Sequence, residues 1–117
     1  MSYVDGFLLP LPTKNLTAYK KMAKLAAKVW MEHGALAYFE CAGDDLKNPM
    51  GASFPGLVKP KRGETIIFAF VVYKTKAERK RVLKAVMSDP RLTGEMTKMP
   101  FDVKRMAYGG FKAIVEA

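Results

Sequence analysis

The segment Thr65–Tyr73 reads T-I-I-F-A-F-V-V-Y and is apolar at almost every position. Successive side chains of a β-strand point to opposite faces of the sheet, so a strand of this composition presents apolar side chains to both faces. The rest of a 117-residue chain can cover one face with helices but has little left for the other. The sequence therefore predicts that the second face is covered by a partner, most simply a second copy of the chain, or forms an unusually apolar binding surface.

The composition is that of one soluble globular domain, with 50% hydrophobic and 26% charged residues. The single cysteine, Cys41, excludes an internal disulfide framework and is typical of a reducing compartment. Asp5, Gly6 and Pro10 interrupt any apolar run near the N-terminus, and no run is long enough to cross a bilayer. We therefore expect a cytoplasmic protein that does not enter the membrane.

The formal net charge of +9 has two interpretations. Much of it falls in residues 14–28 and 74–84, where lysines and arginines recur among apolar helix positions. A basic surface can attract nucleic acid or acidic ligands, but solvated outer faces of amphipathic helices give the same pattern. The helix interpretation is favoured, so nucleic acid is not an expected partner.

Hydrophobic periodicity and turn signals predict six elements in the order β-α-β-β-α-β. The strands are expected at residues 3–11, 35–43, 65–73 and about 104–115. Apolar residues recur every three or four positions along the first helix, at Leu16, Tyr19, Ala23, Ala26, Trp30 and His33. This order is the ferredoxin-like arrangement. We expect one α+β domain over residues 1–117, with a four-stranded antiparallel sheet and both helices on one of its faces.

Three signals mark the ends of the helices, and one long connection interrupts the pattern. Thr13 is a plausible N-cap for the first helix, and Gly34 is a typical residue to end it. Thr75 and Glu78 have the spacing of a capping box, which makes the start of the second helix the best-marked boundary. Residues 44–63 are rich in Gly and Pro, and such a long connection is either a lid or a flexible loop.

Asp5, Glu40 and Arg105 are charged residues inside segments that otherwise look like half-buried or buried strands. A buried charge needs a partner because its desolvation is costly. The first and last strands are neighbours in a ferredoxin-like sheet, which predicts a pair between Asp5 and Arg105, or between Asp5 and Lys104. These residues form either a structural ion pair or the polar part of a small-ligand site in an otherwise apolar cavity.

Trp30, His33, Tyr38 and Tyr108 are the aromatic or proton-handling candidates for such a site. His33 lies one turn after Trp30 on the apolar side of the first helix. A histidine there either packs at the helix C-terminus, which is the favoured interpretation, or transfers protons at the rim of a pocket. The sequence shows no metal-ligand spacing, so we expect no metal and no cofactor. Cys41 is expected to be a buried packing residue rather than a nucleophile.

One motif indicates a different class of protein. Phe68–Tyr73, F-A-F-V-V-Y, matches the last six positions of the RNA-recognition-motif signature and lies on the third strand, where that signature belongs. Its aromatic residues would stack on bases. However, Ile66 and Ile67 replace the basic residue and glycine that open the signature. RNA binding is therefore an alternative reading of the chain.

Several segments are similar to a known family of small bacterial proteins. They are Tyr3–Phe7, Gly34–Leu36, Glu40–Cys41, Met87–Arg91, Met99–Asp102 and Lys104–Phe111. On these segments the whole chain resembles the YbaA-like family, whose function is unknown. Val103 departs from the glycine that family members tend to have there, which puts the turn before the last strand in doubt.

The resemblance implies a fold and an assembly but no reaction. The family looks like part of the dimeric α+β barrel superfamily, in which two ferredoxin-like sheets pack face to face. That superfamily includes cofactor-free monooxygenases, haem-degrading enzymes and ligand-binding proteins. We therefore expect a homodimer whose joined sheets enclose an apolar cavity, which either binds a small organic ligand or acts as a cofactor-free oxygenase. No catalytic residue is implied by the family.

Overall fold

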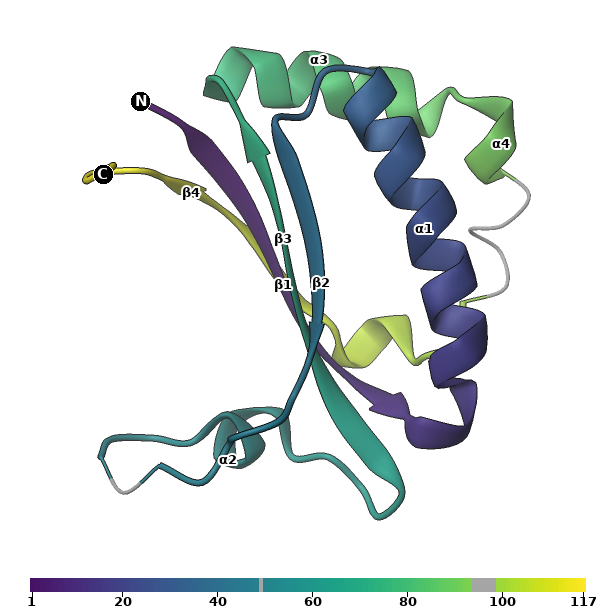
Figure 1. Cartoon of the computed structure of the whole chain (residues 1–117), viewed down its shortest axis with the longest axis vertical. Coiled ribbons are helices and arrows are strands. Elements are labelled where there is room, and N and C mark those ends of the chain that lie inside the picture. Colours follow the sequence, from purple (N-terminus) through teal and green to yellow (C-terminus); the bar gives the residue numbers. More distant parts are fainter. Residues whose placement is uncertain (49, 94–98) are drawn as a thin grey trace.

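The computed structural model of the chain describes residues 1–48, 50–93 and 99–117 and has an α+β architecture (Figure 1). The elements are β1 (Tyr3–Pro12), η1 (Thr13–Asn15), α1 (Leu16–Glu32), β2 (Ala37–Ala42), α2 (Phe54–Val58), β3 (Glu64–Tyr73), α3 (Lys76–Met87), α4 (Pro90–Thr93), η3 (Val103–Arg105) and β4 (Ala107–Lys112). The predicted order of the main strands and helices is confirmed. The short elements α2, α4, η1 and η3 were not predicted.

The four strands form one sheet in the order β2-β3-β1-β4, in which each neighbouring pair is antiparallel. This is the strand order of the ferredoxin-like arrangement. The two inner strands, β1 and β3, pair along their whole lengths, from Tyr3 opposite Tyr73 to Pro12 opposite Glu64. The register fixes which side chains share a face, because paired residues in an antiparallel sheet point to the same side.

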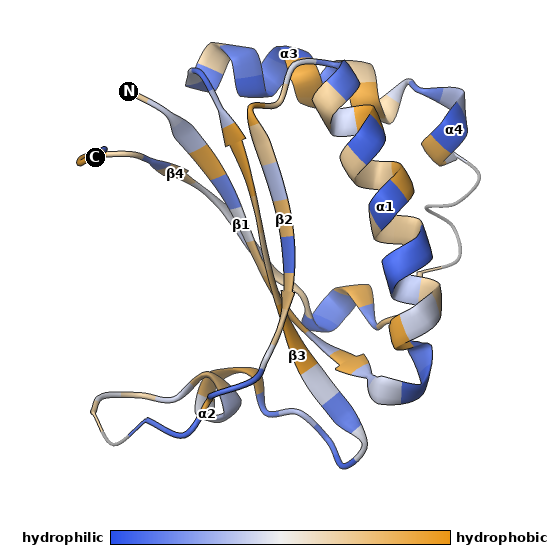
Figure 2. Cartoon of the chain, in the orientation of Figure 1, coloured by the Kyte–Doolittle hydropathy of each residue, from blue (hydrophilic) through white to orange (hydrophobic). Residues whose placement is uncertain are grey.

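Helices α1, α3 and α4 lie on one face of the sheet (Figure 1). The side chains of β3 on that face, Ile67, Ala69, Val71 and Tyr73, are all buried. They pack with buried residues of the helices, including Ala23 and Val29 of α1 and Val82 and Val86 of α3. Figure 2 shows hydrophobic residues along β3, and alternating hydrophilic and hydrophobic residues along α1. The apolar stripe predicted for the first helix therefore faces the sheet.

The opposite face of the sheet, which we call the open face, carries a set of exposed phenylalanines. Phe39, Phe68 and Phe111 are 52%, 45% and 64% exposed. The Phe39 and Phe70 rings stack with centroids 4.9 Å apart, and Phe68 lies 5.9 Å from Phe70. Within a single chain, therefore, only the helix-covered face of β3 is fully buried. The second face has the apolar character that the sequence predicted.

The two predicted helix N-caps have different outcomes. The Thr75 hydroxyl accepts a hydrogen bond from the backbone N–H of Glu78 at 3.1 Å, as the capping box predicted. Thr13 does not cap α1, because β1 continues to Pro12 and residues 13–15 form η1 before α1 begins at Leu16. At the other end of α1, Gly34 has φ of 118°, a conformation that favours glycine and ends the helix as predicted.

The described parts of the 44–63 connection, residues 44–48 and 50–63, lie beside the open face rather than over the helices (Figure 1). The connection contains α2, whose N-cap Ser53 accepts a hydrogen bond from Gly56 N at 3.0 Å. Phe54 of α2 lies 6.4 Å from Phe68, measured between ring centroids. The connection therefore extends the row of aromatic rings on the open face.

The last strand is shorter than predicted and starts later. The segment before β4 forms η3, where the Asp102 side chain accepts a hydrogen bond from Lys104 N at 3.0 Å. Beyond β4, the backbone N–H of Ala113 donates to the carbonyl of Ser2 at 2.9 Å. This bond holds the two ends of the chain side by side (Figure 1).

Candidate functional site

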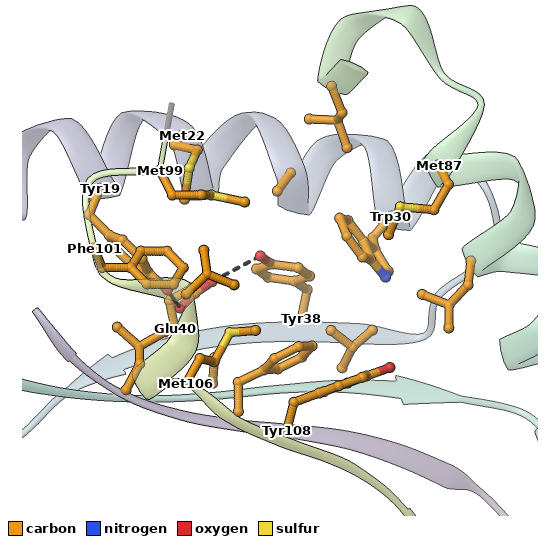
Figure 3. A pocket seen from close by; sticks show the side chains of 18 residues that line it. Tyr19, Met22, Trp30, Tyr38, Glu40, Met87, Met99, Phe101, Met106 and Tyr108 are labelled. Carbon is orange, nitrogen blue, oxygen red and sulfur yellow. Dashed lines mark hydrogen bonds between the residues drawn. The ribbon is translucent and has the colours of Figure 1, made fainter. Parts of the chain in front are cut away.

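A cavity of about 270 Å³ lies between the helix-covered face of the sheet and the helices. Its floor comes from β1, β2 and β3, its roof from α1, α3 and α4, and one wall from residues 99–108. It is lined by Phe7, Leu9, Tyr19, Met22, Ala26, Trp30, Tyr38, Glu40, Ala69, Val71, Leu83, Met87, Leu92, Met99, Phe101, Val103, Met106 and Tyr108. Glu40, Tyr19 and Phe101 lie toward one end, and Trp30 and Met87 toward the other (Figure 3).

Glu40 is the charged residue of this otherwise apolar and aromatic lining. It comes from β2, opposite Ala69 of β3, so its side chain lies on the helix-covered face. The Tyr19 hydroxyl donates to Glu40 Oε1 at 2.7 Å, and the Tyr38 hydroxyl donates to Oε2 at 2.9 Å. Each carboxylate oxygen thus accepts one hydrogen bond from a tyrosine hydroxyl. These bonds reduce the free-energy cost of removing the charge from water.

Burial raises the pKa of the Glu40 carboxyl, and the hydrogen bonds from Tyr19 and Tyr38 counter part of that change. Burial also raises the pKa of both tyrosine hydroxyls, and the neighbouring Glu40 charge raises it further. The tyrosines therefore stay protonated at neutral pH and act as donors. A carboxyl with a raised pKa holds a proton more readily than an ordinary glutamate, which is the direction that general acid–base catalysis uses.

Asp5 lies behind the cavity wall and is fully buried, with 0% of its surface exposed. Its Oδ1 accepts a hydrogen bond from Arg79 Nε at 2.8 Å, and its Oδ2 accepts one from the Tyr73 hydroxyl at 3.0 Å. Tyr73 in turn accepts a hydrogen bond from Trp30 Nε1 at 3.0 Å, and Arg79 Nη2 donates to the Tyr108 hydroxyl at 2.8 Å. Asp5 therefore fixes two cavity residues, Trp30 and Tyr108, without lining the cavity itself.

The predicted pairing of Asp5 with Arg105 or Lys104 is wrong. Lys104 and Arg105 belong to η3, which precedes β4, whereas the residue of β4 opposite Asp5 is Gly110. The Asp5 side chain points toward the helices. It therefore forms its ion pair with Arg79 of α3, which packs on that face of the sheet. Arg105 instead forms two hydrogen bonds with Glu64, at 2.8 and 3.0 Å, and lies outside the cavity lining.

His33 also lies outside the cavity lining. Its Nε2 is 2.9 Å from Asp89 Oδ2, and the same carboxylate accepts hydrogen bonds from the Arg91 guanidinium at 2.8 and 3.0 Å. The hydrogen bonds from Arg91 and His33 hold the pKa of Asp89 well below its usual range. Arg91 also contacts Glu32 at 2.6 Å. This ion-pair cluster joins the end of α1 to α4, which supports a structural position for His33.

No group of three or more His, Cys, Asp or Glu side chains within residues 1–48, 50–93 and 99–117 is arranged to hold a metal ion. In the same residues, no helix is long and apolar enough to cross a membrane. Cys41 is free and exposed on the open face, where it lies opposite Phe68, so the predicted burial of this residue is not found in the single chain.

The sequence profile of a family described as "Protein of unknown function (DUF1428)" matches residues 2–103. The chain belongs to the DUF1428 family. It is 39% identical over 116 residues to the uncharacterized protein YbaA of Escherichia coli strain K12, and to YbaA of Shigella flexneri, with 99% of each chain covered. The resemblance to the YbaA-like family predicted from the sequence is therefore confirmed.

Solved structures similar to this DUF1428 chain share its fold at low sequence identity. A Nitrosomonas europaea protein, provisionally described as an antibiotic biosynthesis monooxygenase, is 14% identical with a TM-score of 0.64, covering 97% of this chain and 90% of that one. Rv0793 from Mycobacterium tuberculosis is 11% identical with a TM-score of 0.62, covering 100% and 99%. A dimeric ferredoxin-like protein from an uncultured marine organism is 12% identical with a TM-score of 0.55, covering all of both chains.

The structure brings four of the seven candidate residues of the DUF1428 chain, Trp30, Tyr38, Glu40 and Tyr108, to one cavity. This cavity lies between the helices and the sheet of one chain, a position that the sequence did not predict, and the expected cavity between two joined sheets stays a prediction. Sequence reasoning treated Tyr19 only as a packing residue, and it did not identify Arg79. Arg79 had a usable signal, because it precedes Val82 and Val86 by three and seven positions and so belongs to the inward face of α3.

Proposed function

We propose that the protein binds a small, largely apolar organic molecule in the cavity between α1 and the sheet, with Glu40 as its polar anchor. The observation that carries this proposal is the Glu40 carboxylate, held by two tyrosine hydroxyls in an otherwise apolar lining. Pockets for small molecules are built in this way, with apolar and aromatic walls and a few placed polar groups that fix orientation.

The size and lining of the cavity support a compact ligand. A volume of about 270 Å³ is close to the lower end of the range for small-molecule sites. Four methionines line it, Met22, Met87, Met99 and Met106, and their flexible thioether side chains adapt to the shape of an apolar ligand. Aromatic rings at both ends of the cavity favour a flat ring over a long aliphatic chain.

Cofactor-free oxygenation is a second candidate function, favoured by the raised pKa of the partly buried Glu40 carboxyl. The Nitrosomonas europaea neighbour, provisionally described as a monooxygenase, has a similar fold. In such a reaction Glu40 would take a proton from an activated CH2 group, and the carbanion would pass electrons to dioxygen. A C–O bond forms and the O–O bond breaks, so that the CH2 group and O2 become a C=O group and water.

We further propose that the protein is a cytoplasmic homodimer whose open faces pack against each other. The exposed phenylalanines of the open face support this assembly, since monomers rarely leave so apolar a surface in water. A similar solved structure is described as a dimeric ferredoxin-like protein. The lone cysteine is in keeping with a reducing compartment.

Binding can be tested with a neutral aromatic probe, 2-phenylethanol, and the emission of Trp30, which is the single tryptophan of the chain and lines the cavity. We expect saturable quenching in the wild type. Ala26→Phe should abolish it because Ala26 lines the cavity, whereas Ala18→Phe places the same side chain on the exposed side of α1 and should not. Circular dichroism checks that both variants fold.

Equal quenching in the two alanine variants would contradict the proposed site. Oxygenation is tested separately, by measuring dioxygen uptake in the presence of ring-activated CH2 compounds. Uptake that disappears in Glu40→Gln would support the second candidate. Ligand binding without dioxygen uptake would contradict oxygenation and support the binding function alone.

A further inference from the structure

The charge inside the cavity has a consequence for the kind of ligand it accepts. Among the described residues that line the cavity, Glu40 is the only acid, and none is a lysine, arginine or histidine. Burial is the largest influence on the pKa of the Glu40 carboxyl and raises it. The hydrogen-bond partners of this carboxyl are two neutral hydroxyl groups. When Glu40 is ionised, the cavity therefore holds a negative charge with no counter-charge among the described residues of its lining.

We infer that the cavity is selective for an organic cation, such as a protonated amine on a small aromatic or apolar body, which would pair with Glu40. This inference rests on the proposed binding function of the cavity. It names the charge class of the ligand, which that proposal leaves open.

Electrostatics in a buried site separates ligands by charge. A carboxylate or phosphate ligand would bring a second negative charge next to Glu40 in surroundings that screen charges poorly, and both charges would lose their hydration. A neutral ligand leaves Glu40 with only its two tyrosine partners. An ammonium group neutralises the carboxylate and can donate to the lone pairs that Tyr19 and Tyr38 leave unused.

The walls of the cavity also suit a cation. The aromatic lining residues are Phe7, Tyr19, Trp30, Tyr38, Phe101 and Tyr108. The faces of aromatic rings attract cations, and several rings around one site form the arrangement that proteins use for organic ammonium groups. The tilted pair of Trp30 and Tyr38, with centroids 5.8 Å apart, contributes two of these rings from α1 and β2.

The positive charge of the rest of the protein does not reverse this preference. The net charge of +9 is carried largely on solvated side chains, and salt screens such charges over about 8 Å. Arg79 contacts Tyr108 at the edge of the cavity, but it is ion-paired with the fully buried Asp5 at 2.8 Å. Among the described residues, Glu40 is therefore the only charged side chain that lines the space a ligand would occupy.

Three probes that share a phenyl ring on a short chain test the inference through Trp30 emission: 2-phenylethylammonium, 2-phenylethanol and 3-phenylpropanoate. At neutral pH we expect the cation to bind at least tenfold more tightly than the neutral alcohol, and the anion to bind most weakly. Glu40→Gln should remove the advantage of the cation and keep binding of the alcohol. Glu116→Gln, a matched change on an exposed glutamate outside the cavity, should keep the wild-type order.

The affinity of the cation should also rise with pH as Glu40 ionises, while that of the alcohol should stay constant. The groups that face Glu40 are Tyr19 from α1 and Tyr38 from its own strand, and the lining residues from β1, β3 and 99–106 are uncharged. If the alcohol binds and the cation binds no better, the inference is overturned and the proposed cavity stands. If none of the probes binds, the proposed function fails and the inference fails with it.

Discussion

Two carboxylates on the helix-covered face of the sheet, Asp5 and Glu40, have opposite surroundings. Asp5 is fully buried and paired with the Arg79 cation, whereas Glu40 has only tyrosine hydroxyls as partners and lines the cavity. The residue types and their strands could be predicted from the sequence. The partners of these two residues could not be predicted. Strand adjacency identifies neighbours within the sheet, but it does not identify an arginine on a helix that packs against the sheet.

The raised pKa of Glu40 predicts a specific pH dependence of stability. Below the ordinary pKa of a glutamate the carboxyl is protonated in both the folded and the unfolded chain. Above it, the folded state keeps the proton longer, so the free energy of unfolding contributed by Glu40 falls as pH rises toward the folded-state pKa. Glu40→Gln lacks this term, and the variant should gain stability relative to the wild type across that interval.

Urea unfolding followed by circular dichroism at several pH values, with protein concentration fixed, measures this difference. Because Glu64 and Asp89 shift in the opposite direction, the wild type alone is not informative, and the difference between the two proteins is the quantity to compare. A difference that stays constant with pH would show that burial does not raise the Glu40 pKa.

At the scale of elements, local signals predicted α3 better than α1. The capping box at Thr75 is a bond between residues three positions apart, and such a signal does not depend on the rest of the fold. The start of α1 depends instead on β1, which pairs as far as Pro12 and carries the chain past Thr13. The cavity within the chain was not predicted, for a similar reason. Its walls come from α1, β2 and residues 99–108, and no spacing within one element reveals how they meet.

Replacing the capping threonine tests the local stabilisation of α3. Thr75→Ala removes the acceptor of the Glu78 N–H and should lower the free energy of unfolding by about 1 kcal/mol. Thr13→Ala is the matched control, because Thr13 is exposed and its side chain caps no helix. Thermal or urea unfolding of both variants gives the comparison. Equal losses in the two would mean that α3 gains nothing from its cap.

At the scale of the whole molecule, the proposed dimer depends on the open face. Phe68→Lys places a charge at the centre of that face, and in a face-to-face dimer the buried lysine would lack a partner. We expect a dimer for the wild type and a monomer for the variant, measured by light scattering at micromolar concentration. Met31→Lys is the control, because Met31 is also 45% exposed but lies on α1, away from the open face.

A wild-type monomer would contradict the proposed dimer. It would also strengthen the RNA alternative, since Phe68 and Phe70 lie on the open face, opposite α1 and α3, where an RNA-recognition motif presents its stacking residues. Sub-micromolar binding of single-stranded RNA at physiological salt, lost in Phe68→Ala, would then establish that alternative. Binding that is weak and disappears with salt would reflect only the net charge.

The strand order also bears on how the chain folds during synthesis. The first strand made, β1, lies between β3 and β4 in the finished sheet, and every one of its pairings joins residues more than fifty positions apart. Contacts between such distant segments are slow to form, because the chain loses the entropy of closing a long loop before the contacts stabilise it. On the ribosome, β1 must therefore wait for residues 64–73 before it gains a neighbour and for residues 107–112 before it has both. The helices can form earlier than the sheet that they cover, because their backbone hydrogen bonds join residues close together in the sequence.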